Sequence, residues 1–230
     1  MRNIPQVIHY CWFGGKPLPM QHKRYLETWK QAFPYYQIMK WDEHNFPIDE
    51  FGYAREAIKA RKMAFVSDVA RIYALYEYGG IYFDTDVEVI KNFDRLLEEK
   101  EAILGTEDEG NTIGTGFMAF IPHHNICTKM LDYYRNNSFL EQSSTMSNTQ
   151  ILAALVKKEY GITPLEKIQE FNNIVLYPSE YFTAYNGLTG KIKITDKTCC
   201  IHHFAASWHS PSRKLKDAIK REVKKFRRTV

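Results

Sequence analysis

The stretch MAFVSDVARIYALYEYGGIYFDTDVEVI, Met63–Ile90, predicts a helix, a glycine turn and a strand in immediate succession. Its first half places apolar residues at largely helical spacing, and the pair Gly79-Gly80 that follows is typical of a helix C-terminus. Its second half is a short aromatic run that leads into two acids, Asp84 and Asp86. Because residues two apart in a strand point to the same face, we expect the two carboxylates to crowd their charges together.

Further strands and helices alternate on both sides of this stretch. Strands are expected at residues 4–13, 36–41, 101–107, 112–121, 173–178 and 199–204, and helices near residues 21–32, 126–136 and 148–160. This alternation predicts an α/β domain with a central sheet flanked by helices, in which ligands bind at the carboxyl ends of strands. Trp12 and Asp84 both lie near such ends.

The composition is that of an ordinary globular protein. The chain has 230 residues, of which 44% are apolar and 25% charged, and it has no repeat, no low-complexity block and no apolar run as long as a membrane span. The N-terminus lacks the features of a secretory signal, so a cytoplasmic protein is expected. The four cysteines lack C-x-x-C spacing, which favours reduced thiols over a disulfide framework or a zinc ribbon.

Basic residues concentrate at the C-terminus. Between Arg213 and Arg228, nine Lys or Arg face two acids, so this segment carries a charge of +7 and the rest of the chain −3. Cations and apolar residues fall on different helical faces, which predicts a basic amphipathic helix over residues 211–230 after a domain at residues 1–210. We expect residues 213–228 to contact an anionic membrane peripherally. A solvated terminal helix and a nucleic-acid contact are the alternatives, and no nucleic-acid partner is expected.

The acid pair suits a metal ion. Two carboxylates held together repel each other unless a proton or a cation intervenes, and Mg²⁺ or Mn²⁺ prefers such oxygen ligands. The chain has no G-x-x-x-x-G-K-[ST] loop and no G-x-G-x-x-G fingerprint, so a metal that bridges phosphates is the obvious means of binding a nucleotide diphosphate. The alternative is that Asp84 and Asp86 form an ordinary surface turn.

Asp68 and Arg71 are three residues apart and share a helix face. They form either a simple ion pair or an acceptor and a donor for a hydroxyl-rich ligand in the same cleft as Asp84. Near the C-terminus, His202 and His203 precede Trp208, and one of the two histidines suits a nitrogen ligand for the metal because adjacent strand residues point to opposite faces.

Trp12 follows the first strand and precedes two glycines that let a ligand approach the backbone. An aromatic ring in this position could stack on a nucleobase, an interaction of about 1–3 kcal/mol. Packing in the core is the alternative interpretation of this residue.

Three blocks of the chain resemble glycosyltransferase family 32, the sugar-binding-region family with the D-x-D motif. It includes capsular-polysaccharide transferases and yeast initiating mannosyltransferases, and it is related to the glucosyltransferase domains of large clostridial toxins. IPQVIHYCWFGGKPLP is similar to the opening motif, FVSDVARIYALYEYGGIYFDTDV to the central one and HHFAASW to the closing one. The segment 111–150, where acceptor contacts are expected, matches only loosely.

The resemblance implies a GT-A type nucleotide-sugar-binding fold, with a Rossmann-like central mixed sheet, and roles for individual residues. Asp68 and Arg71 match the pair that holds the donor sugar, and together with Asp84 and Asp86 they form the expected catalytic group. Donor-binding positions are expected at Trp12, which resembles the tryptophan on the uracil, at Asp84, which should lie near the ribose and the sugar, and at Tyr82, Ser207 and Trp208. His203 lies where relatives carry a metal-binding residue, so the implied ligands of Mn²⁺ or Mg²⁺ are Asp84, Asp86 and His203.

We therefore expect a metal-dependent, retaining glycosyltransferase that moves a hexose from a UDP-sugar to a saccharide or lipid-linked saccharide acceptor in glycan or capsular polysaccharide biosynthesis. Its expected location is the cytoplasm, with peripheral contact to the inner face of the cell membrane. Two other classes remain. A sugar nucleotidyltransferase would release pyrophosphate, and a non-catalytic binding module at a membrane surface would show no metal-dependent turnover.

Overall fold

The computed structural model describes residues 3–107, 110, 112–142, 146–163, 165–186 and 190–205. Within these ranges, seven strands form one mixed sheet in the order β2-β1-β3-β6-β5-β8-β7. Strand β1 is parallel to β2 and β3, whereas β6 is antiparallel to β3 and β5. The strands are β1 Val7–Cys11, β2 Gln37–Trp41, β3 Gly80–Phe83, β5 Ala102–Glu107, β6 Thr112–Phe120, β7 Gln169–Phe171 and β8 Ile174–Tyr177. The predicted α/β class with a central mixed sheet is confirmed.

A second, two-stranded sheet joins β4 (Val87–Val89) to β9 (Cys200–His202). The two strands are antiparallel, and Val87 lies opposite His202. This pairing brings the segment after the acid pair against a strand more than 100 residues later in the chain.

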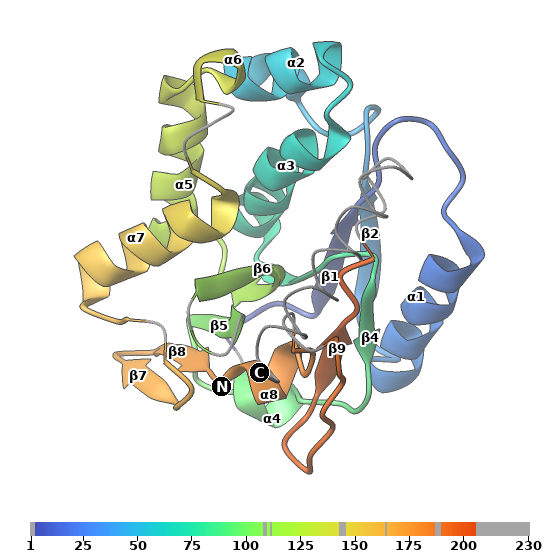
Figure 1. Ribbon diagram of the computed structural model, residues 1–230, viewed down its shortest axis with the longest axis vertical. Coiled ribbons are helices and arrows are strands. Elements are labelled where there is room, and N and C mark those ends of the chain that lie inside the picture. Colours follow the sequence, from blue (N-terminus) through green and yellow to red (C-terminus); the bar gives the residue numbers. More distant parts are fainter. Residues whose placement is uncertain are drawn as a thin grey trace, which may run out of the picture.

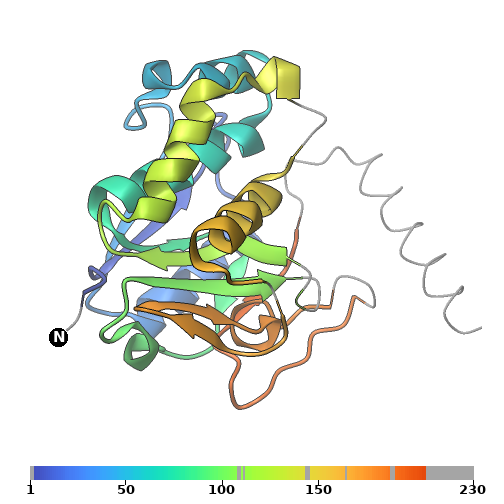
Figure 2. The same ribbon diagram turned by 90° about the vertical axis from the view of Figure 1, so that its left-hand side faces the viewer.

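Helices cover both faces of the large sheet (Figures 1 and 2). The helices α2 (Gly52–Lys59), α3 (Met63–Tyr78), α5 (Asn125–Asn136), α6 (Phe139–Gln142) and α7 (Asn148–Tyr160), with the short helix η1 (Ile48–Glu50), lie on one side. On the other side, α1 (Met20–Ala32), α4 (Asp94–Leu97) and α8 (Ser179–Phe182) share a second apolar layer with the β4–β9 sheet. In the described ranges, no helix combines the length and apolarity that a membrane crossing requires.

Two glycines turn the chain from α3 into β3. Gly79 ends the helix with a φ of 61°, and Gly80 follows with a φ of 98°, a region that side chains other than glycine rarely adopt. A Cβ atom on Gly79 would also lie 2.6 Å from Cδ of Pro122. The glycine pair is therefore required both for its backbone conformation and for close packing. It connects α3 to β3, which lies between β1 and β6 in the sheet.

Candidate active site

Asp84 and Asp86 lie in a turn and not on the face of one strand. Strand β3 ends at Phe83 and β4 begins at Val87, and the backbone N–H of Val87 donates to the carbonyl of Asp84 at 3.0 Å. The N–H of Asp84 donates to the carbonyl of Gly116 on β6 at 2.8 Å. The expectation of a continuous strand was wrong because the chain leaves the large sheet here, and it is the turn that brings the two carboxylates together.

The histidine beside the acids is His202. Its Nε2 lies 3.3 Å from Oδ1 of Asp86 and 3.9 Å from Oδ2 of Asp84. One ligand atom from each of the three residues lies within 4.8 Å of the others. Oxygen atoms from two carboxylates and one imidazole nitrogen form a donor set that fits Mn²⁺ or Mg²⁺.

His203, which was expected in this position, lies elsewhere. Its Nε2 hydrogen-bonds to Oε2 of Glu88 at 2.8 Å, and its ring stacks on Tyr25 with the ring centroids 4.6 Å apart. The expected placement of His203 was wrong because Val87 pairs with His202, so the alternation of side chains along β9 turns His202 to the acids and His203 away.

A glycine provides the space for this cluster. A Cβ atom on Gly116 would lie 2.5 Å from Cε1 of His202 and 3.2 Å from Oδ2 of Asp84. Only a residue without a side chain therefore lets the histidine and the acid converge over β6. This cradle supports the fit of a small cation to the three residues.

Opposite charges dominate the protonation states of the cluster. Burial lowers the pKa of His202, but the carboxylates of Asp86 and Glu107 outweigh burial and hold that pKa well above its ordinary value. Burial raises the pKa of Asp86, but the charge and the hydrogen bond of His202 and the N–H of Ala205 keep it well below its ordinary value. Oppositely charged neighbours therefore set the pKa values of both residues.

The buried guanidinium of Arg71 links the turn Asp84–Asp86 (the acid turn) to helix α3. Its Nη2 lies 3.1 Å from Oδ1 of Asp68, and its Nη1 lies 3.2 Å from Oδ1 of Asp84. Nη1 also donates to the carbonyl of Thr115 at 2.8 Å. The two residues therefore form an ion pair that also contacts the turn at Asp84, and the role of this pair toward a hydroxyl-rich ligand stays a prediction.

Asp68 has an environment unlike that of a surface acid. Burial raises its pKa to about 6, although the charge of Arg71 acts in the opposite direction. The amide of Asn148 donates to Oδ1 of Asp68 at 2.6 Å and to Oγ1 of Thr115 at 2.9 Å. A carboxylate near the midpoint of its titration is a feature of functional sites.

Sequence reasoning missed Asn148 as a site residue. Asn148 is the first residue of α7, directly after Ser147, whose side chain accepts from the N–H of Gln150 in a reciprocal capping box. The pattern Ser-x-x-Gln before an apolar run was the available signal for the helix start. That this start would face Asp68 depends on the packing of α7 against β6.

Tyr82 supports the acid turn from within the core. Its side chain is 1% exposed, and its hydroxyl donates to Oδ1 of Asp84 at 2.8 Å. The guanidinium carbon of Arg71 lies 4.8 Å from the centre of the ring. Tyr82 thus holds Asp84 in place, and the contact with a nucleoside that the resemblance implied stays a prediction.

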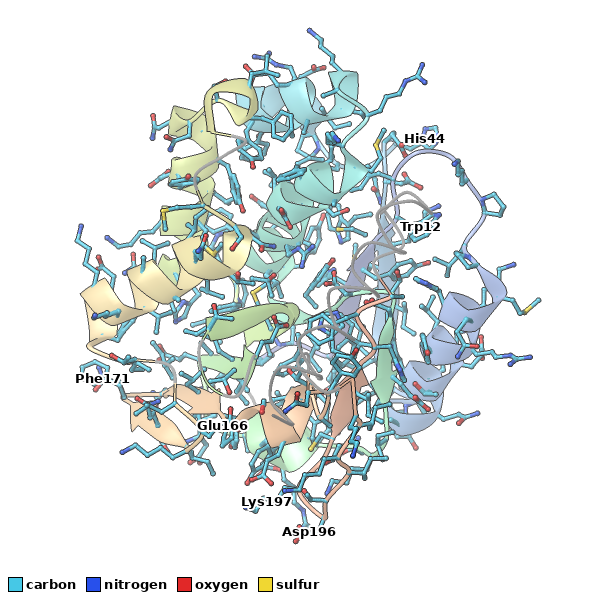
Figure 3. All side chains as sticks on the ribbon, viewed as in Figure 1. Trp12, His44, Glu166, Phe171, Asp196 and Lys197 are labelled. Atoms are coloured by element: carbon cyan, nitrogen blue, oxygen red, sulfur yellow. The ribbon has the colours of Figure 1, made fainter. Side chains whose placement is uncertain are left out.

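Trp12 lies beyond the end of β1, on the same side of the molecule as His44 (Figure 3). Its indole N–H donates to the carbonyl of Lys16 at 2.6 Å, and its ring meets His22 edge-on with the centroids 5.7 Å apart. His22 in turn hydrogen-bonds through Nδ1 to Oγ1 of Thr85, between the two acids, at 2.8 Å. Trp12 is therefore connected to the acid turn, and its stacking on a base stays a prediction.

Several predicted positions lie outside the described residues. These are Ser207 and Trp208 in the expected donor site, and the basic helix at residues 211–230. Their predicted roles stay predictions.

The arrangement of sheet and helices is that of the GT-A fold. The chain aligns with a crystal structure of the galactosyltransferase LgtC in complex with donor and acceptor sugar analogs, with a TM-score of 0.52, 11% identity and coverage of 95% of each chain. At this low identity the likeness concerns the fold alone, and it confirms the predicted fold class.

The acid turn lies in a part of the chain that is similar to a known sequence family. Residues 19–103 match the family described as "Glycosyltransferase sugar-binding region containing DXD motif", which confirms the resemblance found in the sequence. The chain therefore has the GT-A fold, and the part of it around the acid turn is similar to the glycosyltransferases of this family.

Two relatives are similar over different lengths. An uncharacterized glycosyltransferase of Acanthamoeba polyphaga mimivirus is 27% identical, over 92% of this chain and 86% of that protein. A lactosylceramide 4-alpha-galactosyltransferase of Mus musculus is 30% identical over 56% of this chain, and the aligned part spans 34% of the mouse protein.

Proposed function

We propose that this chain transfers a hexose from a nucleotide sugar, most naturally a UDP-sugar, to a saccharide or lipid-linked saccharide, with a divalent cation and with retention of anomeric configuration. The observation that carries this proposal is the convergence of Asp84, Asp86 and His202 within 4.8 Å, next to the ion pair of Asp68 with the buried Arg71. The first group suits a cation on a diphosphate, and the second suits the hydroxyl groups of a sugar.

A divalent cation held by Asp84, Asp86 and His202 would neutralise the negative charge that develops on a departing nucleoside diphosphate. The residues of the chain hold the reacting groups in position. Arg71 fixes the distance between the acid turn and Asp68, since the guanidinium contacts both carboxylates. Asp68 retains acceptor capacity for sugar hydroxyls, because a carboxylate has about four acceptor sites.

Retention requires no further carboxylate beside the sugar. The acceptor hydroxyl attacks the anomeric carbon from the side on which the diphosphate leaves, the bond from that carbon to the diphosphate oxygen breaks, and a diphosphate oxygen takes the hydroxyl proton. This route differs from that of the glycoside hydrolases, which need a pair of carboxylates that flank the scissile bond. The turn acids therefore stay available for the cation.

The name of one relative supports a lipid-linked acceptor. The mouse protein is named for lactosylceramide, a glycolipid, and residues of this chain align with about a third of it. We propose that this chain works in the cytoplasm at the inner face of a membrane, where the basic segment 213–228 would contribute about 1 kcal/mol per cation near an anionic surface. Liposome binding should be lost when the chain is truncated after residue 210, and unchanged binding would contradict this location.

The proposal is tested with a panel of UDP- and GDP-sugars in the presence of Mn²⁺, with EDTA as the metal-free reference. We expect release of a nucleoside diphosphate from one donor, and we expect Asp86→Ala to reduce turnover to the level with EDTA. Asp196→Ala is the matched control, since Asp196 is exposed and lies far from Trp12 in Figure 3. Pyrophosphate release from a nucleoside triphosphate would instead identify a nucleotidyltransferase, and full activity of Asp86→Ala would overturn the metal site.

A further inference from the structure

Glu107 lies on the far side of His202 from the acid turn. Its Oε1 is 3.3 Å from Nδ1 of His202, while Nε2 of the same ring is 3.3 Å from Oδ1 of Asp86. Both Glu107 and His202 are at most 9% exposed. The imidazole is therefore held between two carboxylates, one from the end of β5 and one from the turn before β4.

The site is shaped to hold Glu107 in this position. Gly114 on β6 lies directly against the Glu107 carboxylate, where a Cβ atom would overlap Oε1. Gly116 leaves room for the His202 ring in the same manner, and Phe204 stacks on the ring with the centroids 3.9 Å apart. The backbone N–H of His202 donates to the carbonyl of Thr183 at 3.0 Å and holds this part of β9 in place. The ring therefore has one orientation, with Nδ1 toward Glu107 and Nε2 toward the acids.

We infer that Glu107 is a positioning residue that keeps the proton of neutral His202 on Nδ1 and so leaves the lone pair of Nε2 for a divalent cation. A neutral imidazole carries one N–H, and the hydrogen bond at one nitrogen decides which nitrogen can bind metal. Without an acceptor at Nδ1, the proton would sit on Nε2 and be donated to Asp86, which would occupy both the nitrogen and a carboxylate oxygen. The inference rests on the proposed metal site at Asp84, Asp86 and His202.

The chain contains a second carboxylate–histidine pair that serves as an internal comparison. Oε2 of Glu88 lies 2.8 Å from Nε2 of His203, and neither residue belongs to the group of Asp84, Asp86 and His202 that could hold a cation. Glu88→Gln therefore alters the carboxylate partner of His203, the residue next to His202, and leaves the proposed metal ligands unchanged.

The experiment measures Mn²⁺ binding to the full chain by electron paramagnetic resonance of the free ion, without donor or acceptor. We expect Glu107→Leu to bind Mn²⁺ about 10–100-fold more weakly than the wild type. Glu107→Gln, whose amide oxygen still accepts from Nδ1, should bind more tightly than Glu107→Leu, and Glu88→Gln should be unchanged. Two substitutions of similar volume guard against a simple loss of folding, which circular dichroism would reveal. Wild-type affinity in a folded Glu107→Leu chain would overturn the inference.

A spectroscopic measurement separates positioning from general destabilisation. Long-range ¹H–¹⁵N correlation spectra of the chain with diamagnetic Mg²⁺ should show the His202 proton on Nδ1 in the wild type and on Nε2 in Glu107→Leu. A proton on Nε2 in the wild type overturns the inference.

Mn²⁺ binding to Asp86→Ala distinguishes a failure of this inference from a failure of the proposed function. If Asp86→Ala abolishes Mn²⁺ binding and Glu107→Leu does not weaken it, only the role of Glu107 is contradicted. If neither substitution weakens Mn²⁺ binding, the proposed metal site is contradicted as well.

Discussion

The ring of His202 rests on the backbone of Gly116, because a Cβ atom at position 116 would lie 2.5 Å from Cε1 and 2.7 Å from Nδ1 of the histidine. The same Cβ would lie 3.2 Å from Oδ2 of Asp84. We therefore expect Gly116→Ala to displace the ring from the acids and to weaken Mn²⁺ binding about tenfold or more, as the loss of ligand orientation does in other metal sites. Isothermal titration calorimetry of the folded variant measures this change.

Gly52→Ala is the matched control for this substitution. Gly52 begins α2, and its added Cβ would meet Nη2 of Arg55 at 3.8 Å, an ordinary contact. The control should bind Mn²⁺ with wild-type affinity. If Gly116→Ala folds and binds Mn²⁺ equally well, His202 is not a ligand of the cation.

The pH dependence of turnover should report Asp68. Burial raises the pKa of this residue to about 6. The carboxylate is the better acceptor for sugar hydroxyls, so kcat/KM should rise as the pH increases through about 6. Asn148→Ala removes a hydrogen bond that favours the charged form, so the rise should shift to higher pH.

The pH profile of kcat/KM for both chains checks this expectation. Asn136→Ala serves as the control, because the Asn136 amide donates to the carbonyl of Asp132 at an exposed end of α5. A profile of Asn148→Ala that coincides with that of the wild type would show that Asp68 does not govern the acid limb.

Arg71 should not be replaceable by lysine. Its guanidinium contacts Asp68, Asp84 and the carbonyl of Thr115 at once, and an ammonium group cannot span these three acceptors. We expect Arg71→Lys to lower kcat/KM about 100-fold through misplaced carboxylates. Arg71→Met leaves two acids without their cation and should cost about 3–5 kcal/mol of unfolding free energy. Steady-state kinetics and urea unfolding measure the two effects, and wild-type values for Arg71→Lys would contradict the argument.

His9 should make the fold sensitive to acid. Nε2 donates to the carbonyl of Gly79 at 2.8 Å, and Nδ1 accepts from the indole N–H of Trp41 at 3.1 Å, so the buried ring is neutral. Burial lowers its pKa from 6.5 to about 4, against the opposing hydrogen bond to Gly79. The unfolded chain binds the second proton of the imidazole more tightly than the folded chain does. The free energy of unfolding is therefore at its full value above about pH 6.5, and it decreases by about 3 kcal/mol as the pH falls toward about 4.

The comparison of wild type with His9→Gln isolates this contribution from those of the carboxylates. Urea unfolding at about pH 7.5 and about pH 4.5 should show the stability advantage of the wild type shrinking by about 2–3 kcal/mol at the lower pH. An advantage that is the same at both pH values would mean that His9 keeps its ordinary pKa in the folded chain.

Local signals sufficed for most of the secondary structure. The helix that ends at Gly79, the helix over residues 148–160 and the strands around residues 102–107 and 174–177 follow from apolar spacing, caps and glycine conformations, which act within a few residues. The same signals failed where a strand breaks without a proline or glycine. At Asp84–Asp86 the apolar residues on both sides favour a continuous strand over the alternative of a turn, and the hydrogen bond from Val87 to Asp84 that closes the turn cannot be seen in the sequence.

By itself, the sequence determined the α/β class, the acid pair and the partnership of Asp68 with Arg71, because these depend on residue patterns within short segments of the chain. Only the tertiary structure decided that His202 and not His203 joins the acids, since adjacent residues of a strand differ only in the face they occupy. That face is set by the register of β4 against β9, a pairing of segments more than 100 residues apart. The positions of Glu107 and Asn148 were decided in the same way, because both side chains pack against residues 114–115 of β6 from distant parts of the chain.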